Sequence, residues 1–200
     1  MQVYLIVNPR RKNNHLPSLI RCNMRKLTTA ELNRLSPEEF KLSERLPLVV
    51  VLDNVRSGHN VGSVFRTCDA FGVTGLYLCG ITPYPPNREV MKTSLGSDNT
   101  IDWFAVPDAK KILQELKESG FEIIFSEHTT HSISLNEFKP SRDKKYAFVF
   151  GNEVDGIQHD LLPFADHAVE IPQFGTKHSF NISVAAGIVI WDFFVKYSRD

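Results

Sequence analysis

Residues 48–72, LVVVLDNVRSGHNVGSVFRTCDAFG, predict a buried strand followed by a helix more clearly than any other stretch. Residues 48–52 are continuously apolar and mostly β-branched, which is typical of a strand buried on both faces of a parallel sheet. Over residues 60–71 the apolar side chains recur at helical spacing, and Gly72 follows as a stop signal. The polar residues in between predict a loop at the carboxyl end of the strand.

The rest of the chain repeats this alternation. Further strands are expected at residues 75–80, 100–104, 121–126, 146–150 and 168–171, and further helices at residues 89–95, 107–119 and 181–196. Residues 28–35 and 36–40 predict two short capped helices, the second beginning with Ser36 and Pro37. The pattern predicts an α/β fold with a mostly parallel sheet and helices on both faces.

Composition excludes several classes of protein. The chain has 200 residues, of which 42% are hydrophobic and 23% charged, as expected for a globular domain with a sizeable core. No apolar run reaches the roughly 18 residues of a membrane span. Basic residues follow the first apolar stretch instead of preceding it, so no signal peptide is expected. Three separated cysteines, Cys22, Cys68 and Cys79, suit a reducing cytoplasm, and the last two occupy core positions.

Charge is divided unevenly along a chain whose formal net charge is zero. Residues 1–47 hold nine Lys or Arg and four Glu, a net of +5, which leaves −5 for residues 48–200. We therefore expect a basic, partly helical extension over residues 1–47 and the main domain over residues 48–200. The extension either binds a polyanion or is a solvated arm without a binding role.

Three polar loops carry the candidate chemistry, because ligands of parallel sheets bind beyond the carboxyl ends of strands. They span residues 53–66, 150–157 and 171–187. A purely structural interpretation is open for each loop, with Asn60, Asp155, and Asn181 or Ser183 as helix caps. No His or Cys stands at metal-ligand spacing nearby, so no metal is expected. His128 and His131 are expected to be solvent-exposed.

Taken together and in order, the three loops resemble the motifs of the SpoU (TrmH-type) branch of the SPOUT RNA methyltransferases. The first motif is Asn-x-Gly-x-x-x-Arg, present at residues 60–66. The second is Gly-Asn-Glu-x-x-Gly, present at residues 151–156. The third is an Ile-Pro pair followed by a Ser-Leu-Asn-Val-Ser-like segment, present at residues 171–172 and 179–183 with Phe180 and Ile182 as replacements.

This resemblance implies a fold whose C-terminal part is tied in a trefoil knot, a homodimer, and a bound S-adenosylmethionine. It implies methylation of a ribose 2′-hydroxyl in tRNA or rRNA. It also places the last helix at the dimer interface. The exposed position that this implies for Trp191, Phe193 and Phe194 has one alternative, core packing within a single chain. Carried onto this sequence, the cofactor-binding residues are Phe150, Gly151, Ile171, Gln173, Phe174, Gly175, Ser179 and Phe180.

The resemblance makes Arg66 the main catalytic candidate. Guanidinium groups stay protonated in proteins, so Arg66 either clamps the phosphate beside the target ribose or transiently takes a proton in a desolvated state. Glu153 would orient Arg66 or Asn60, and Asn60, Ser179 and Asn181 would complete a polar wall. Candidate RNA contacts are Arg10, Arg11, Lys12, Arg56, Arg66 and Lys92.

Other functions remain open at this point. The RNA substrate is tRNA, which the small basic arm favours, or rRNA. A second possibility is a family member that binds RNA without chemistry. A third is an unrelated nucleotide-binding α/β enzyme, although the chain has neither a Gly-x-Gly-x-x-Gly fingerprint nor a Walker A loop.

Overall fold

The computed structural model describes residues 24–28 and 30–199. The chain divides into two units, residues 1–35 and residues 36–200, and each is described by itself. The sheet and its helices all belong to the second unit. The boundary predicted after residue 47 falls inside this unit, since helix α1 (Pro37–Leu42) is grouped with the sheet.

The two helices predicted before the first strand have different outcomes. Helix α1 forms as predicted, with the Ser36 hydroxyl accepting from the Glu39 backbone N–H and the Glu39 carboxylate accepting from the Ser36 N–H. The helix predicted over residues 28–35 is wrong, because the described residues of this stretch form only the single turn η1 (Ala30–Leu32). The Glu31 carboxylate binds Arg25 and the Thr28 backbone, which favours a local turn over a continued helix.

Seven strands form one sheet in the order β3-β2-β1-β6-β4-β7-β5, and every pair is parallel. The predicted α/β fold is therefore confirmed. The strands are β1 (Leu46–Asp53), β2 (Val73–Cys79), β3 (Trp103–Val106), β4 (Phe121–Ser126), β5 (Ile133–Ser134), β6 (Lys145–Phe150) and β7 (His167–Glu170). The connections hold α2 (Gly58–Phe71), α3 (Arg88–Ser94), η2 (Ser97–Asn99), α4 (Ala109–Glu118), η3 (Leu135–Glu137), η4 (His159–Phe164) and α5 (Ile182–Arg199).

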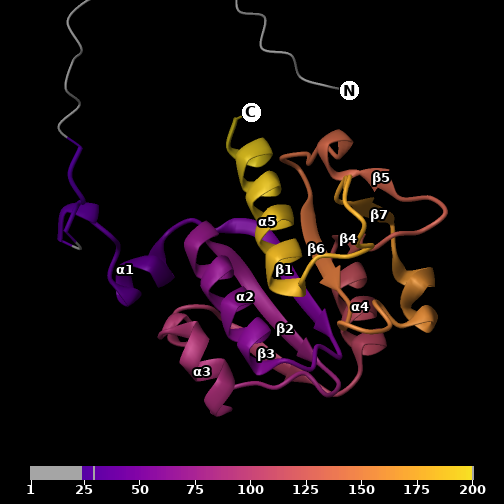
Figure 1. Ribbon diagram of the computed structural model, residues 1–200, viewed down its shortest axis with the longest axis horizontal. Coiled ribbons are helices and arrows are strands. Elements are labelled where there is room, and N and C mark those ends of the chain that lie inside the picture. Colours follow the sequence, from indigo (N-terminus) through magenta and orange to yellow (C-terminus); the bar gives the residue numbers. More distant parts are fainter. Residues whose placement is uncertain (1–23, 29, 200) are drawn as a thin grey trace, which may run out of the picture. The chain divides into compact units, whose positions relative to one another are not determined.

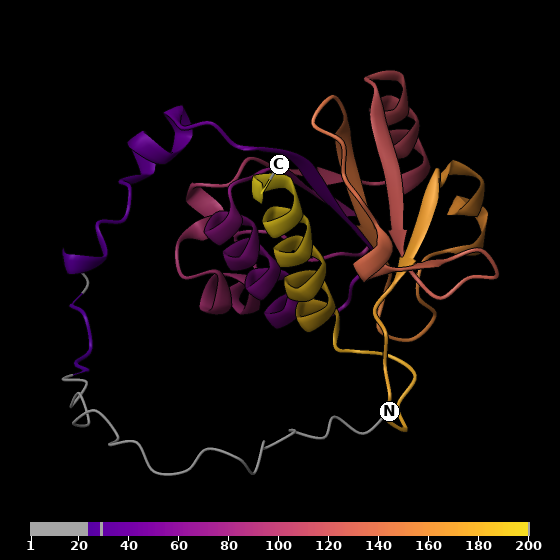
Figure 2. The same ribbon diagram turned by 90° about the horizontal axis from the view of Figure 1, so that it is seen from above.

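Helices cover both faces of the sheet (Figures 1 and 2). Leu48, Val50 and Leu52 of β1 point to the face that carries α2 and α5, while Val49 and Val51 point to the face of α4 and η4. All five side chains are buried, which explains why residues 48–52 lack the alternation of a half-exposed strand. Cys68 and Cys79 are buried in these two cores, as predicted.

Several predicted boundaries shift for local reasons. Helix α2 begins at Gly58, not Asn60, because the Ser57 hydroxyl caps it by accepting from the Asn60 backbone N–H at 3.3 Å. Gly62 then lets α2 approach α3 closely, since a Cβ at this position would lie 2.3 Å from the Val90 carbonyl oxygen. The strand predicted at residues 100–104 begins later, at Trp103, after the turn η2.

The aromatic side chains of helix α5 lie partly in the core and partly on the surface. Phe193 is fully buried between Tyr146 and Phe148, so its predicted place at a dimer interface is wrong. Trp191 and Phe194 are exposed. Within the described residues, no helix is long and apolar enough to cross a membrane.

Candidate active site

Four strands end side by side at one edge of the sheet. Because β1, β6, β4 and β7 are parallel neighbours, the segments that follow Asp53, Phe150, Ser126 and Glu170 all emerge at this edge. The three predicted loops are among these segments. The fourth, after β4, was expected only to hold exposed histidines.

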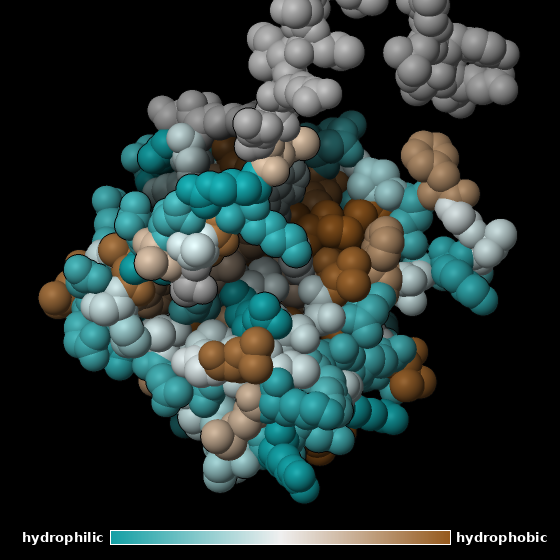
Figure 3. Space-filling view, turned by 60° about the vertical axis from the view of Figure 1, so that its left-hand side comes forward, coloured by the Kyte–Doolittle hydropathy of each residue, from teal (hydrophilic) through white to brown (hydrophobic). Residues whose placement is uncertain are grey.

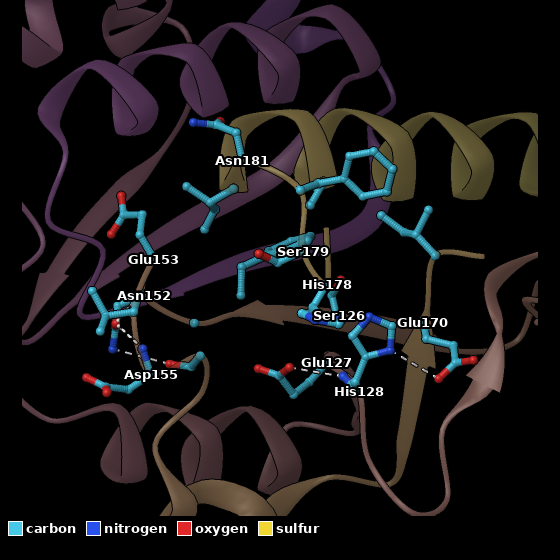
Figure 4. A pocket seen from close by; sticks show the side chains of 18 of the residues that line it. Ser126, Glu127, His128, Asn152, Glu153, Asp155, Glu170, His178, Ser179 and Asn181 are labelled. Carbon is cyan, nitrogen blue, oxygen red and sulfur yellow. Dashed lines mark hydrogen bonds and ion pairs between the residues drawn. The ribbon is translucent and has the colours of Figure 1, made fainter. Parts of the chain in front are cut away.

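The segments after β4, β6 and β7 line a cavity of about 530 Å³ (Figure 4). The loop after β1, with Asn60, lies outside this lining. One part of its lining is apolar and includes Ile171, Ile182 and Ala185. The remainder is polar, with carboxylates and amides but, among the described residues, neither Lys nor Arg. The predicted site residues found in the lining are Phe150, Gly151, Glu153, Ile171, Gln173, Ser179, Phe180 and Asn181.

A chain of hydrogen bonds joins the three predicted loops. The Glu153 carboxylate accepts from Asn60 Nδ2 at 2.9 Å and from the backbone N–H groups of Arg56 and Ser57. Asn60 Oδ1 in turn accepts from Asn181 Nδ2 at 3.1 Å. Asn181 Oδ1 accepts from the backbone N–H and the hydroxyl of Ser183. Of the two partners proposed for Glu153, the structure selects Asn60.

Glu153 orients the side-chain amides of Asn60 and Asn181 through these hydrogen bonds. An ionised carboxylate only accepts hydrogen bonds, so Asn60 must present its NH₂ to Glu153 and its oxygen to Asn181. Partial burial opposes ionisation of Glu153, but the hydrogen bonds from Asn60, Arg56 and Ser57 outweigh it, and the pKa of the carboxyl lies below its ordinary value. The carboxylate is therefore ionised near neutral pH.

The turn that carries Glu153 is held by its own backbone. Asn152 and Gly156 exchange backbone hydrogen bonds, and Asn152 Oδ1 accepts from the N–H groups of Val154 and Asp155. Gly156 has φ +69°, a conformation that favours glycine. Gly151 packs so closely that an added Cβ would lie 2.0 Å from the Gly156 carbonyl carbon. Both glycines are needed for this tight turn.

The segment after β4 contributes site residues that the sequence interpretation missed. Ser126, Glu127 and His128 line the cavity, together with Glu170 at the end of β7. Glu170 accepts from the Ser132 hydroxyl and contacts His128 Nδ1 at 3.3 Å, and these partners hold the pKa of its carboxyl below the ordinary range. The only sequence signal was polar residues directly after a buried strand, but their proximity to the motif loops depends on the strand order.

Some predicted site residues are not brought to the cavity. Arg66 is exposed on α2 and is absent from the lining, and the side chain of Phe174 is completely exposed. Gly175 and Lys92 are likewise outside the lining. Arg56 is exposed, with its guanidinium 3.8 Å from Asp155. The predicted RNA contacts Arg10, Arg11 and Lys12 lie outside the described residues.

The part of the chain that the structure describes contains no group of three or more His, Cys, Asp or Glu side chains placed to hold a metal ion. His128 is exposed, as predicted, although it borders the cavity. The donor groups of the cavity are thus amides, hydroxyls, backbone N–H groups and the imidazoles of His128 and His178.

The network makes a testable prediction about Glu153. Glu153→Gln should lower the free energy of unfolding near neutral pH by about 1 kcal/mol, because a glutamine NH₂ cannot accept from the loop N–H groups. Folding lowers the pKa of Glu153, so its contribution is complete above the unfolded-state pKa and is lost as the pH falls through the folded-state pKa. Urea denaturation of both proteins should therefore show a difference near pH 7 that shrinks toward about pH 3.

The control is Glu118→Gln on α4, which also removes a carboxylate but lies outside the network. This variant should match the native protein at both pH values. A stability loss in Glu153→Gln that does not change with pH would contradict the assigned role of the carboxylate.

Comparison with known proteins adds to this geometry. The chain is 33% identical over 176 residues to a tRNA (guanosine(18)-2′-O)-methyltransferase from Thermus thermophilus, covering 84% of each chain. It is 35% identical over 144 residues to the 23S rRNA (guanosine-2′-O-)-methyltransferase RlmB from Neisseria meningitidis. That alignment covers 72% of this chain but only 56% of the Neisseria protein.

Solved structures share the fold as well. An Aquifex aeolicus TrmH/SpoU tRNA modifying enzyme superimposes with a TM-score of 0.70 at 28% identity, covering 81% of this chain and 82% of that one. An AdoMet-bound rRNA methyltransferase from Sinorhizobium meliloti gives 0.69 at 27% identity, covering 80% and 60%. The model of the SpoU rRNA Methylase family matches residues 47–191. The chain therefore belongs to the SpoU family of the SPOUT methyltransferases.

Proposed function

We propose that this protein transfers the methyl group of S-adenosylmethionine to a ribose 2′-hydroxyl of a structured RNA. The observation that carries the proposal is the hydrogen-bonded chain from Glu153 through Asn60 to Asn181 at the edge of the 530 Å³ cavity. Relatives named for 2′-O-methylation of guanosine in tRNA and rRNA support it.

The cavity suits an adenosyl ligand. Its volume lies in the range of small-molecule sites, which are mostly apolar with a few placed polar groups. Phe150, Ile171 and Ile182 offer an apolar wall to a nucleobase, and the carboxylates of the lining favour a ligand that carries positive charge. The structure from Sinorhizobium meliloti holds AdoMet, which supports the same cofactor here.

The chemistry leaves the protein two tasks. S-adenosylmethionine, when bound, supplies a methyl group already activated by its sulfonium. A ribose hydroxyl is a weak nucleophile at neutral pH, so the protein must align it and help it lose its proton. Asn60 and Asn181 each use one amide hydrogen in the network, so each has a second amide hydrogen that can donate to a ligand. Glu153 orients both amides. We assign these amides and the Ser179 hydroxyl to alignment.

Arg66 is proposed as a clamp for an RNA phosphate, not as a base. Its exposed guanidinium lies outside the cavity lining, where an RNA backbone has access to it. A guanidinium binds a phosphate with two parallel hydrogen bonds and so fixes the attached ribose in one orientation. The hydroxyl proton then leaves to water or to a phosphate oxygen.

Transfer RNA is favoured over ribosomal RNA as the substrate. The alignment with the Thermus thermophilus tRNA enzyme covers equal shares of both chains, whereas the Neisseria rRNA enzyme is covered over little more than half its length. The cytoplasm is the proposed place of action, since the described cysteines Cys68 and Cys79 are free and buried.

The first experiment is a methyl-transfer assay with labelled S-adenosylmethionine. Bulk tRNA and bulk rRNA from cells that lack this gene serve as separate substrates, followed by nucleoside mass analysis. We expect a 2′-O-methylated nucleoside in the tRNA pool. Label in rRNA alone would establish the alternative substrate. Donor binding with label in neither pool would favour an RNA-binding protein without chemistry.

The Arg66→Ala variant separates transfer from donor binding in this assay. Transfer should fall by about a hundred-fold, as when a group that stabilises the transition state is removed. Donor affinity, measured by calorimetry, should be unchanged because Arg66 is outside the cavity lining. Turnover close to that of the native protein would remove Arg66 from the catalytic assignment.

We also propose that the protein is a homodimer that uses α5. Val184 and Trp191 are about half exposed on this helix, and Figure 3 shows apolar residues exposed on an otherwise largely hydrophilic surface. Trp191→Arg should therefore shift sedimentation velocity profiles from dimer toward monomer. Leu42→Arg, which changes another exposed apolar side chain, is the control. A native protein that sediments as a monomer at micromolar concentration would refute the proposal.

The basic arm is proposed to contact the RNA backbone. Removal of residues 1–27 deletes six Lys or Arg and no acidic residue. RNA affinity should fall, and its dependence on salt should flatten because fewer counterions are released on binding. Donor affinity should not change. An unchanged slope of affinity against salt would exclude the arm from RNA binding.

A further inference from the structure

The carboxylate of Glu127 lines the cavity, and the proposed function gives it no task. Among the described residues it differs from the other acids of the lining in that it has neither a charged partner nor a side-chain hydrogen bond. It follows β4 directly and is half-buried. Its Oε1 accepts from the His128 backbone N–H at 3.0 Å, and its Oε2 accepts from the Ile157 backbone N–H at 3.1 Å. The other acids of the lining differ, since Glu153 holds Asn60, Glu170 holds Ser132 and His128, and Asp155 lies near Arg56.

The two N–H donors hold the carboxylate without saturating it. A carboxylate offers about four acceptor positions, and two of those on Glu127 are taken. One donor is the adjacent residue and the other lies 30 residues further along the chain than Glu127, so each carboxylate oxygen is held by a different segment. The remaining acceptor positions are available to a ligand in the cavity that Glu127 lines.

The neighbouring turn leaves room for this carboxylate. A Cβ at Gly156 would lie 2.3 Å from Glu127 Oε2, so the carboxylate lies directly against the backbone of the turn.

The position of Glu127 indicates which part of a ligand it meets. In Figure 4 it lies along the lower edge of the drawn side chains, between Asn152 and Asp155 on one side and His128 and Glu170 on the other. The Glu153–Asn60–Asn181 chain marks the end where methyl transfer takes place. In an adenosyl donor the ribose links the base to the side chain that carries the sulfonium, so the ribose lies between the base and the transfer end.

We propose that Glu127 binds the ribose hydroxyls of the adenosyl ligand. The inference rests on the proposed function and adds a donor-binding residue to it. A carboxylate that accepts from ribose hydroxyls is the solution that dinucleotide-binding folds use to recognise this sugar. Here the acid comes from the segment after β4, outside the three motifs of the resemblance.

The test compares two ligands on the whole protein by calorimetry. They are S-adenosylhomocysteine and its 2′,3′-dideoxy analogue, which lacks both hydroxyls. The native protein should prefer the hydroxylated ligand by about ten-fold or more, the usual effect of a hydrogen bond to a charged group. Glu127→Ala should bind both ligands with nearly equal affinity.

A merely structural role gives a different result. If Glu127 only holds the loops, its loss lowers the affinity for both ligands by the same factor. The preference for the ligand with hydroxyls then remains, and this result overturns the inference. The same holds if the carboxylate meets the ammonium group of the ligand. Glu127→Gln, which keeps one acceptor oxygen, should retain part of the preference and serves as the second variant if the alanine variant does not fold.

Glu118→Ala is the matched control, since it also removes a glutamate but lies outside the cavity lining. It should keep the full ten-fold preference. A native protein that binds neither S-adenosylmethionine nor S-adenosylhomocysteine refutes the proposed function and this inference together. Native binding with no loss of preference in Glu127→Ala refutes the inference alone.

Discussion

The Glu153 carboxylate constrains everything at the edge of the sheet. It is ionised and only accepts hydrogen bonds, so it determines the direction in which Asn60 and then Asn181 present their amides. The same carboxylate accepts from the backbone after β1. One carboxylate therefore starts a chain of hydrogen bonds that joins three loops, with its members about 90 and 120 residues apart in sequence.

The parallel sheet makes this arrangement possible. Strands β1, β6, β4 and β7 are neighbours, so the loops after them meet at a single edge. The loops after β6, β4 and β7 line the cavity, and the loop after β1 joins them through its hydrogen bonds to Glu153. In Figure 4 Glu153 and Asn181 lie on one side of the cavity, the His128–Glu170 pair lies on the other, and Glu127 lies below and between them. The apolar wall comes from the strand ends and the start of α5.

Much of the fold and of the site could be predicted from local signals. Burial on both faces makes residues 48–52 uniformly apolar, and the Ser36–Glu39 capping box identifies the start of α1. Polar motif residues after buried strands indicated Glu153, Asn60 and Asn181. Local signals failed at residues 28–35, where Glu31 binds Arg25 and Thr28 and a helix does not continue. They also failed for Phe193, because its direction depends on how α5 packs on β6.

The sequence by itself determined the α/β class, the parallel sheet, the three loops and the family they resemble, since these depend on periodicity, burial and residue type over short stretches. The tertiary structure alone decided that Glu153 pairs with Asn60, that Arg66 and Phe174 stay outside the cavity, and that Glu127 enters it. The physical reason is the strand order. Placing β4 between β6 and β7 brings the segment after β4 beside the Asn152–Gly156 turn, and no local pattern encodes that neighbour.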